Sequence, residues 1–293
     1  MTATIMDGRA LAAEVEVRLK LEVRRLKSLG VEPTLATILV GEDPASRAYV
    51  SSKQKAAARI GISSVGHRLP QETTAEELTT LIKGLNSDGR VNGILLQLPL
   101  PGHLDEREMI EQINPEKDVD GLTSANAGKL FYGSSDLVPC TPRGVMELLH
   151  RYQIRTASSL TVIVNRSTLV GKPLYHLLLG EDATVIMCHS KSTDLASVTR
   201  QADIVITAVG RRPQFVLTAD MVKDGAVVVD VAMNRVEGRL MGDVDFDGVS
   251  KRASFITPVP GGVGPMTVTM LMQNTLIAAA KSSKILLPPV VPS

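Results

Sequence analysis

The sequence predicts an α/β protein of two domains, each built on a parallel sheet. Three observations support this fold class. The chain has 293 residues, which is more than one core of ordinary size organises. Apolar runs alternate with helical patterns, as in βαβ units. Hydrophobic residues make up 44% of the chain but aromatic residues only 3%, and aliphatic side chains suit parallel strands buried on both faces. Ligands of such sheets bind outside the carboxyl ends of the strands.

The first half of the chain follows this alternation. Gly30 and Gly61 stand where helices are expected to stop, and Thr74 with Glu77 has the form of a capping box that opens a helix. The expected elements are helix 9–29, strand 35–40, helix 45–60, strand 62–69, helix 74–85, strand 91–98 and helix 105–113.

The second half begins at a Pro-rich segment, PCTPRG at 139–144. Thr141 as N-cap and Pro142 at the first helical position predict a helix to about Tyr152. The elements expected next are strand 160–164, a helix ending at 179, strands 183–187, 203–209 and 226–230, and helix 266–280. We therefore expect an N-terminal domain, 1–140, completed by 266–293, and a Rossmann-like domain, 141–265. The Pro-rich tail, 284–293, is expected to be poorly packed.

Composition excludes several classes of function. A formal charge of +1 gives no electrostatic attraction to nucleic acid or to an anionic membrane. The N-terminus carries no basic and apolar leader, and no run reaches membrane-spanning length, so a cytoplasmic protein is expected. Cys140 and Cys188 lack CxxC spacing, and the five histidines are scattered, so we predict no metal site. The expected partners are small molecules or a second copy of the chain.

Tyr49 and Lys53 are the first candidates for chemistry. They stand four residues apart in helix 45–60, so an aromatic ring and an amine share one face. The alternative is a solvated Lys beside a half-buried Tyr. Gln97 lies at the carboxyl end of a strand, where ligands bind. Asp120 belongs to a short charged loop, which by itself is more typical of a turn with surface charges.

The segment after strand 160–164 is the candidate cofactor site. A strand, a tight turn and a helix N-terminus form the phosphate-binding arrangement of dinucleotide folds. The glycine fingerprint is incomplete, because only Gly171 is present and Asn165 occupies the position of the first Gly, at some conformational cost. The next strand ends without the acid of NAD-binding domains and is followed by Ser190, while Arg166 lies in the preceding turn. This chemistry suits a 2′-phosphate, and the predicted cofactor is NADP.

A segment with three Pro and three Gly, at 257–267, is the most unusual composition in the chain. Its backbone is able to approach a ligand closely. A rigid linker before the last helix is the alternative interpretation.

Four motifs in this order closely resemble the bifunctional methylenetetrahydrofolate dehydrogenase/methenyltetrahydrofolate cyclohydrolase (FolD) family. They are YVSSK at 49–53, GILLQLPLP at 93–101, KDVDG at 117–121 and PVPGGVGPMT at 258–267. The resemblance extends from Gly8 to about Ala280. It implies an N-terminal folate-binding domain completed by the C-terminal helix, a Rossmann-like NADP-binding domain, and an active site in the cleft between them. A homodimer formed through the cofactor domain is also implied.

The resemblance further implies two reactions at one site. The first transfers a hydride from 5,10-methylenetetrahydrofolate to NADP⁺, and the second hydrolyses the methenyl product to 10-formyltetrahydrofolate. Hydride transfer needs alignment of donor and nicotinamide. Hydrolysis needs proton transfer, which suits a Lys when burial and a neighbouring cation favour its neutral form.

Site residues are carried over from the family by motif. Lys53 is the expected catalytic Lys, Gln97 holds it, Tyr49 orients the folate, and Asp120 binds the pterin. The remaining positions are assigned to substrate binding (Pro258 and Gly262) and to cofactor binding (Thr141, Asn165, Arg166, Ser167, Gly171 and Ser190). Because Asn165 stands where the family usually has Gly, the turn geometry and the cofactor affinity are expected to be affected there.

Two rival functions remain open. One is a dehydrogenase without cyclohydrolase activity, and the other is a folate-binding or nucleotide-binding protein without catalysis. Both rank lower, because Tyr49, Lys53, Gln97 and Asp120 are all present.

Overall fold

The computed structural model describes residues 2–286, which divide into two compact units. Of the described residues, one unit combines 2–13 with Thr141–Thr267, and the other combines Glu14–Cys140 with 268–286. Two long helices, α1 (Gly8–Ser28) and α10 (Val263–Ser282), have residues in both units. Most of the tail for which poor packing was expected, 284–293, lies outside the described residues.

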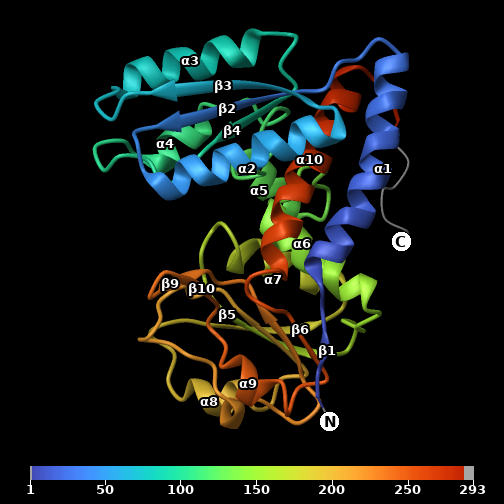
Figure 1. The fold of residues 1–293 in the computed structure, drawn as a ribbon, viewed down its shortest axis with the longest axis vertical. Coiled ribbons are helices and arrows are strands. Elements are labelled where there is room, and N and C mark those ends of the chain that lie inside the picture. Colours follow the sequence, from blue (N-terminus) through green and yellow to red (C-terminus); the bar gives the residue numbers. More distant parts are fainter. Residues whose placement is uncertain (1, 287–293) are drawn as a thin grey trace. The chain divides into compact units, whose positions relative to one another are not determined.

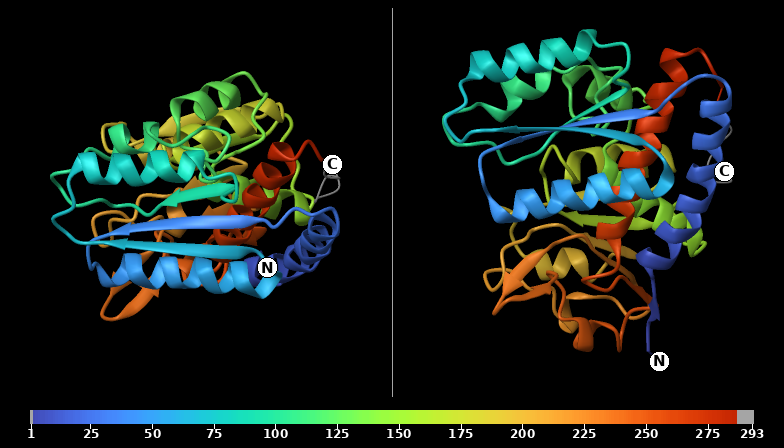
Figure 2. Two further views of the ribbon diagram at one scale, coloured as in Figure 1. Left: turned by 90° about the horizontal axis from the view of Figure 1, so that it is seen from above. Right: turned by 45° about the horizontal axis from the view of Figure 1, so that its top comes forward.

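The unit that contains Glu14–Cys140 is built on a three-stranded parallel sheet in the order β3-β2-β4. Its strands are β2 (Thr34–Val40), β3 (Ser63–Leu69) and β4 (Gly93–Leu96). Helix α2 (Pro44–Ile60) covers one face of the sheet and α3 (Ala75–Ser87) the other, as Figures 1 and 2 both show. Every residue of the central strand β2 is buried, which fits its mainly aliphatic sequence.

Local capping positions the helices of this unit. The Asp43 side chain accepts a hydrogen bond of 2.7 Å from the Ser46 amide at the start of α2, and Gly61 ends this helix in the left-handed conformation. Thr74 and Glu77 form the predicted capping box of α3. Two short helices, α4 (Glu106–Glu111) and α5 (Ser124–Phe131), follow β4. The second of these was not predicted from the sequence.

The other unit contains a six-stranded parallel sheet in the order β1-β11-β8-β7-β5-β6. The strands are β1 (Thr4–Ile5), β5 (Leu160–Val164), β6 (Thr184–Cys188), β7 (Ile204–Thr207), β8 (Val227–Asp230) and β11 (Phe255–Ile256). Both neighbours of β5 follow it in the sequence, so the strand order reverses there. Such a switch point is where doubly wound sheets bind their ligands.

Shorter elements complete this unit. A hairpin is formed by the paired strands β9 and β10. The elements are α6 (Cys140–Arg151), α7 (Gly171–Gly180), α8 (Leu195–Thr199), the 3₁₀ turn η1 (Ala219–Met221), β9 (Asn234–Val236), β10 (Arg239–Met241) and α9 (Phe246–Val249).

Two helix starts differ from the sequence prediction by more than one residue. Helix α6 already begins at Cys140, so Thr141 lies inside it, and the Thr141 hydroxyl is hydrogen-bonded to that of Thr267 at 3.0 Å. Helix α10 begins at Val263, three residues earlier than expected, because Pro265 is tolerated in a first turn.

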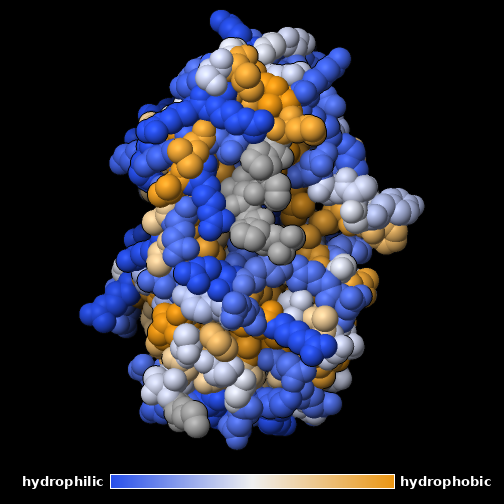
Figure 3. Space-filling model, turned by 90° about the vertical axis from the view of Figure 1, so that its right-hand side faces the viewer, coloured by the Kyte–Doolittle hydropathy of each residue, from blue (hydrophilic) through white to orange (hydrophobic). Residues whose placement is uncertain are grey.

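The surface of the molecule is largely polar on the face drawn in Figure 3, where hydrophobic side chains form only small patches. Among the described helices, none combines the length and the apolar character needed to cross a bilayer.

Candidate active site

Lys53 and Gln97 are brought together by neighbouring elements of the same unit. Lys53 lies on α2, and Gln97 directly follows β4. The Lys53 ammonium donates a hydrogen bond of 3.1 Å to Gln97 Oε1. Gln97 is 8% exposed, and its Nε2 donates to the Leu98 carbonyl at 2.6 Å, which leaves Oε1 oriented toward the amine. Lys53 is therefore a half-buried, hydrogen-bonded amine rather than a freely solvated one.

Tyr49 lies one turn before Lys53 on α2 and is 42% exposed. Residues four apart on a helix point in the same direction, so the Tyr49 ring is on the Lys53 side of the helix. A partly exposed aromatic ring beside a held amine is suitable for contact with a flat heterocycle.

Asp120 lies in a loop that is fixed at both ends. The preceding acid, Asp118, is 1% exposed, and its backbone pairs with that of Ile94 in β4 as an isolated parallel β-bridge. Its carboxylate accepts hydrogen bonds from the Thr123 amide and hydroxyl, each at 2.8 Å, and from Asn126 Nδ2 at 2.9 Å. This loop is therefore an ordered turn and not a solvated one.

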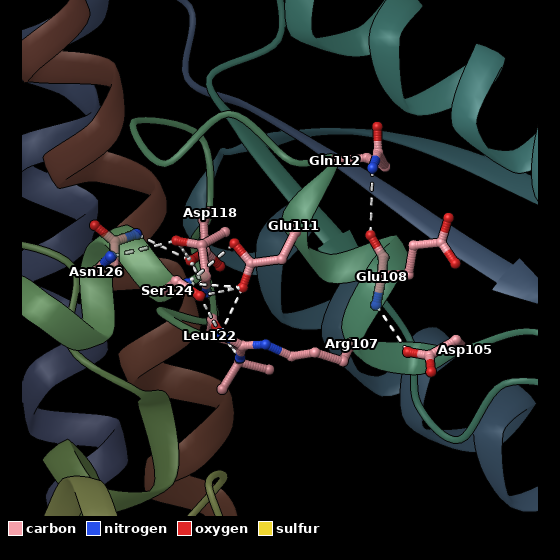
Figure 4. A network of polar contacts seen from close by, with 10 residues as sticks. Asp105, Arg107, Glu108, Glu111, Gln112, Asp118, Leu122, Ser124 and Asn126 are labelled. Carbon is pink, nitrogen blue, oxygen red and sulfur yellow. Dashed lines mark hydrogen bonds and ion pairs between the residues drawn. The ribbon is translucent and has the colours of Figure 1, made fainter.

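Figure 4 shows a second layer of contacts around the same loop. The Glu111 carboxylate accepts from the Ser124 amide at 2.9 Å and from its hydroxyl at 2.7 Å. Arg107 donates to the Leu122 carbonyl at 3.2 Å and also forms an ion pair with Glu111. Helix α4 thus holds the start of α5 and the loop before it.

The charge state of Asp120 depends on its surroundings. Burial raises the pKa of its carboxyl group above the ordinary value, and this effect is larger than the lowering by the nearby Lys53 charge and by a hydrogen bond from Cys140. Asp118 raises the pKa further. The charge of Lys53 thus acts on the Asp120 carboxyl group within this unit.

Asn165 organises the candidate cofactor turn in the other unit. Its Oδ1 accepts hydrogen bonds from the Ser167 amide at 2.7 Å and from the Gly171 amide at 3.0 Å. Its Nδ2 donates to the Ala208 carbonyl, which follows β7, at 2.5 Å. The cost expected at this position is absent, because Asn165 is not among the residues with positive φ. Asn therefore fits the turn through its side chain.

Gly171 begins α7 directly against this turn. A Cβ atom at Gly171 would lie 2.4 Å from the Asn165 carbonyl oxygen, so only Gly fits there. Ser167 contributes a hydroxyl that accepts from the Val170 amide at 3.1 Å. The turn and the first residues of α7 form one compact, hydrogen-bonded loop at the switch point of the sheet.

Arg166 and Ser190, the residues predicted to bind a 2′-phosphate, follow two neighbouring strands. Val164 and Cys188 are register partners on the parallel strands β5 and β6, and the two residues each follow their strand at the same distance of two positions. Both are exposed, and among the contacts of the described residues neither side chain forms a hydrogen bond or ion pair. A cation and a hydroxyl without internal partners, with no acid at this end of β6, fit NADP better than NAD.

The first part of the Gly- and Pro-rich segment, 257–262, is irregular backbone in the same unit, and 263–267 are the first residues of α10. The Gly262 amide donates to the Pro258 carbonyl at 2.8 Å, and a Cβ at Gly262 would lie 2.7 Å from that oxygen. The amide of Arg9, in α1, donates to the Gly261 carbonyl at 3.1 Å. Pro258 also lines a pocket of about 270 Å³, together with Arg212 and Thr257. The segment is packed against its own unit, unlike a free linker.

The predicted site residues therefore fall into two groups. Tyr49, Lys53, Gln97 and Asp120 belong to one unit. Those of the other unit are Thr141, Asn165, Arg166, Ser167, Gly171, Ser190, Pro258 and Gly262. Within residues 2–286, no group of three or more His, Cys, Asp or Glu side chains is arranged to hold a metal ion.

Two residues beside Asp120 were not singled out as site residues from the sequence. Cys140 donates to Asp120 Oδ1 at 3.5 Å, and Asn274 of α10 donates to the Val119 carbonyl at 2.8 Å. Asn274 is more than a hundred residues away in the sequence, so no local pattern indicates this contact.

The fold and these two groups define a dinucleotide-binding α/β protein with a Lys and amide pair on a separate unit. Family models agree with this class. The catalytic domain of the tetrahydrofolate dehydrogenase/cyclohydrolase family matches residues 6–120, and the NAD(P)-binding domain of the same family matches residues 139–283. The chain belongs to the tetrahydrofolate dehydrogenase/cyclohydrolase family.

Similar proteins support this assignment over nearly the whole chain. The "Bifunctional protein FolD" of Cenarchaeum symbiosum is 54% identical, with 94% of this chain and 98% of that protein covered. The protein of the same name from Moorella thermoacetica is 52% identical, with 96% of this chain and 100% of that protein covered.

Solved structures have the same fold. The bifunctional FolD enzyme of Campylobacter jejuni is 48% identical with a TM-score of 0.93, covering 95% of this chain and 99% of that chain. The FolD enzyme of Trypanosoma brucei, solved with NADP cofactor and inhibitor, is 39% identical with a TM-score of 0.92, covering 97% of this chain and 99% of that chain.

Proposed function

We propose that this protein oxidises 5,10-methylenetetrahydrofolate to 5,10-methenyltetrahydrofolate with NADP⁺ and hydrolyses the product to 10-formyltetrahydrofolate. Family membership and the bifunctional relatives support both reactions. The observation that carries the proposal is the hydrogen bond of 3.1 Å between Lys53 and Gln97, in the same unit as Asp120. A simple binding protein has no need of an amine held in this way.

Asp120 is assigned to pterin binding. An ionised carboxylate has two acceptor oxygens, which suit the amino group and the adjacent ring N–H of a pterin. Tyr49 offers an exposed ring on the same side of α2 as Lys53, where it contacts the flat substrate. Pro258 and Gly262 are assigned to substrate binding on the other unit.

Lys53 is the proposed proton-transfer group of the hydrolysis. In its neutral amine form it accepts a proton from the water that adds to the methenyl carbon, and it returns that proton to the ring nitrogen when the carbon–nitrogen bond breaks. The remaining hydroxyl proton leaves to solvent as the formyl C=O forms. Gln97 restricts the amine to one direction, so that this transfer needs little rearrangement. Hydride transfer requires alignment of the reactants but no side-chain acid.

The residues assigned to the cofactor bind NADP⁺ and fix its orientation. NADP⁺, when bound, supplies the hydride acceptor. Arg166 and Ser190 are assigned to the 2′-phosphate, because a guanidinium forms strong charged hydrogen bonds with phosphate oxygens. The turn around Asn165, Ser167 and Gly171 is assigned to the phosphates at the helix N-terminus. Thr141 is assigned to the nicotinamide side.

We also propose a cytoplasmic homodimer formed through the cofactor domain. Apolar side chains remain exposed along the edge strand β6 and the helix before it, with Leu179 50% and Ile186 39% exposed. Light scattering tests the dimer, and Ile186→Glu is expected to weaken it. Cys140 and Cys188 are free thiols, which suits a reducing compartment.

The Lys53→Met variant tests the function. We expect loss of cyclohydrolase activity with unchanged NADP binding, because Met keeps the length of the side chain but transfers no proton. Lys55→Met, at an exposed position of the same helix, is the matched control and retains both activities. Cyclohydrolase activity in Lys53→Met would contradict the assigned role, and equal loss of NADP binding would indicate misfolding.

A further inference from the structure

A fully buried Asn connects the C-terminal helix to the backbone beside Asp120. Asn274 of α10 is 0% exposed. Its Nδ2 donates to the carbonyl of Val119, the residue before Asp120, and to that of Val138, both at 2.8 Å. Buried carbonyls need such partners, because an unpaired one carries the full cost of desolvation. One amide group thus donates hydrogen bonds to carbonyls of two separate backbone segments.

The two segments joined by Asn274 are also packed against each other. Gly121, directly after Asp120, has a φ of 70°, and a Cβ there would lie 2.8 Å from the Leu137 carbonyl oxygen. The backbone at Gly121 therefore packs directly against the backbone at Leu137. With Asn274 bound to the Val119 carbonyl, Asp120 is held from both sides.

Cys140 extends this arrangement to the carboxylate itself. Its thiol lies 3.3 Å from the Val119 carbonyl oxygen and 3.5 Å from Asp120 Oδ1. A thiol has one hydrogen to donate. The Cys140 thiol is therefore shared between the Val119 carbonyl and the Asp120 carboxylate. Within residues 2–286 this is the only hydrogen bond that the Asp120 carboxylate accepts.

We propose that Asn274 is a positioning residue for folate binding, which acts by fixing the loop that presents Asp120 to the pterin. The inference rests on the proposed function, in which Asp120 binds the substrate. It assigns the C-terminal helix a role in substrate affinity, through a side chain that does not touch the substrate. A shift of the loop misaligns two hydrogen bonds at once, so substrate affinity is sensitive to the loss of Asn274.

The test replaces Asn274 with Leu, which keeps the branched shape of the side chain and removes the hydrogen bonds that Nδ2 donates to the Val119 and Val138 carbonyls. We expect the KM for 5,10-methylenetetrahydrofolate to rise roughly tenfold, as for the loss of one well-aligned hydrogen bond, with the NADP dissociation constant unchanged. Thr275→Val is the matched control. Thr275 is equally buried on the same helix, but its hydroxyl donates only to the Leu271 carbonyl of its own helix.

A double-mutant cycle separates positioning from general stability. In the Asp120→Asn background, Asn274→Leu is expected to leave the folate KM unchanged, because the residue acts through Asp120. If Asn274→Leu does not fold, Asn274→Ser keeps one donor, and its KM is expected to lie between those of the wild type and Asp120→Asn.

Two results would overturn the role. One is an Asn274 variant with a lowered melting temperature and a wild-type folate KM, and the other is an additive effect in the cycle. Either result would leave the proposed function intact if the wild-type protein turns over folate. Absence of wild-type turnover would remove the proposed function and this role together.

Discussion

Replacing Asn165 with Ala is expected to destabilise the cofactor-binding unit and to weaken NADP binding. The change removes three hydrogen bonds, from the amides of Ser167 and Gly171 and to the Ala208 carbonyl. Each contributes about 1 kcal/mol net, and since Asn165 is half-buried we expect a loss of about 2–3 kcal/mol in the free energy of unfolding. For a unit of this size that corresponds to roughly 5–10 °C in melting temperature.

The assay is thermal unfolding followed by circular dichroism, with NADP affinity measured by fluorescence titration. Asn165→Asp keeps the acceptor for the Ser167 and Gly171 amides and loses only the donor to Ala208, so a smaller effect is expected. Thr168→Ala, at an exposed position of the same turn, is the control. A melting temperature for Asn165→Ala equal to that of Thr168→Ala would refute the reasoning, because the side chain would then not support the turn.

Three further predictions concern the cofactor, the substrate and the loop. Arg166→Ala is expected to raise the KM for NADP⁺ at least tenfold while the KM for NAD⁺ changes little, because only NADP⁺ carries the 2′-phosphate. Steady-state kinetics with both cofactors measure this. Equal changes in the two KM values would mean that the 2′-phosphate assignment of Arg166 is wrong. Burial raises the pKa of Asp120, so its ionised form is lost at a higher pH than that of an exposed Asp. The folate KM is therefore expected to rise as the pH falls through the acid range in the wild type but not in Asp120→Asn, and parallel pH profiles would contradict this. Gly121→Ala is expected to cost about 1–3 kcal/mol, because φ is 70° and the new Cβ would meet the Leu137 carbonyl; chemical denaturation checks this, and an unchanged midpoint would contradict it.

Long patterns in the sequence predicted most of the fold. Strand β2 and helix α2 were predicted to within about one residue, because each has a continuous signal and the helix has a clear stop at Gly61. The elements that were missed are short. Strand β1 has two residues and α8 has five, and in so few residues neither alternation nor helical spacing is recognisable.

In the candidate site, too, local patterns were predictable from the sequence and contacts between distant residues were not. Tyr49 and Lys53 are related by local spacing, so their common face was predictable from the helix pattern. From the sequence, Asn165 was expected to impose a conformational cost on the backbone of the turn. In the structure its side chain instead holds the turn by hydrogen bonds, one of which reaches the Ala208 carbonyl after β7 and was not predictable from local sequence. Asn274 depends on contacts across more than a hundred residues, which no local pattern records.

The most direct test of the proposed function is an absorbance time course of the purified protein with 5,10-methylenetetrahydrofolate, with NADP⁺ or NAD⁺, following both the reduced cofactor and the methenyl product. We predict faster reduction with NADP⁺ and little accumulation of the methenyl compound. Accumulation would mean a dehydrogenase without the hydrolytic step. No reduction with either cofactor would contradict the enzymatic function and favour a binding protein.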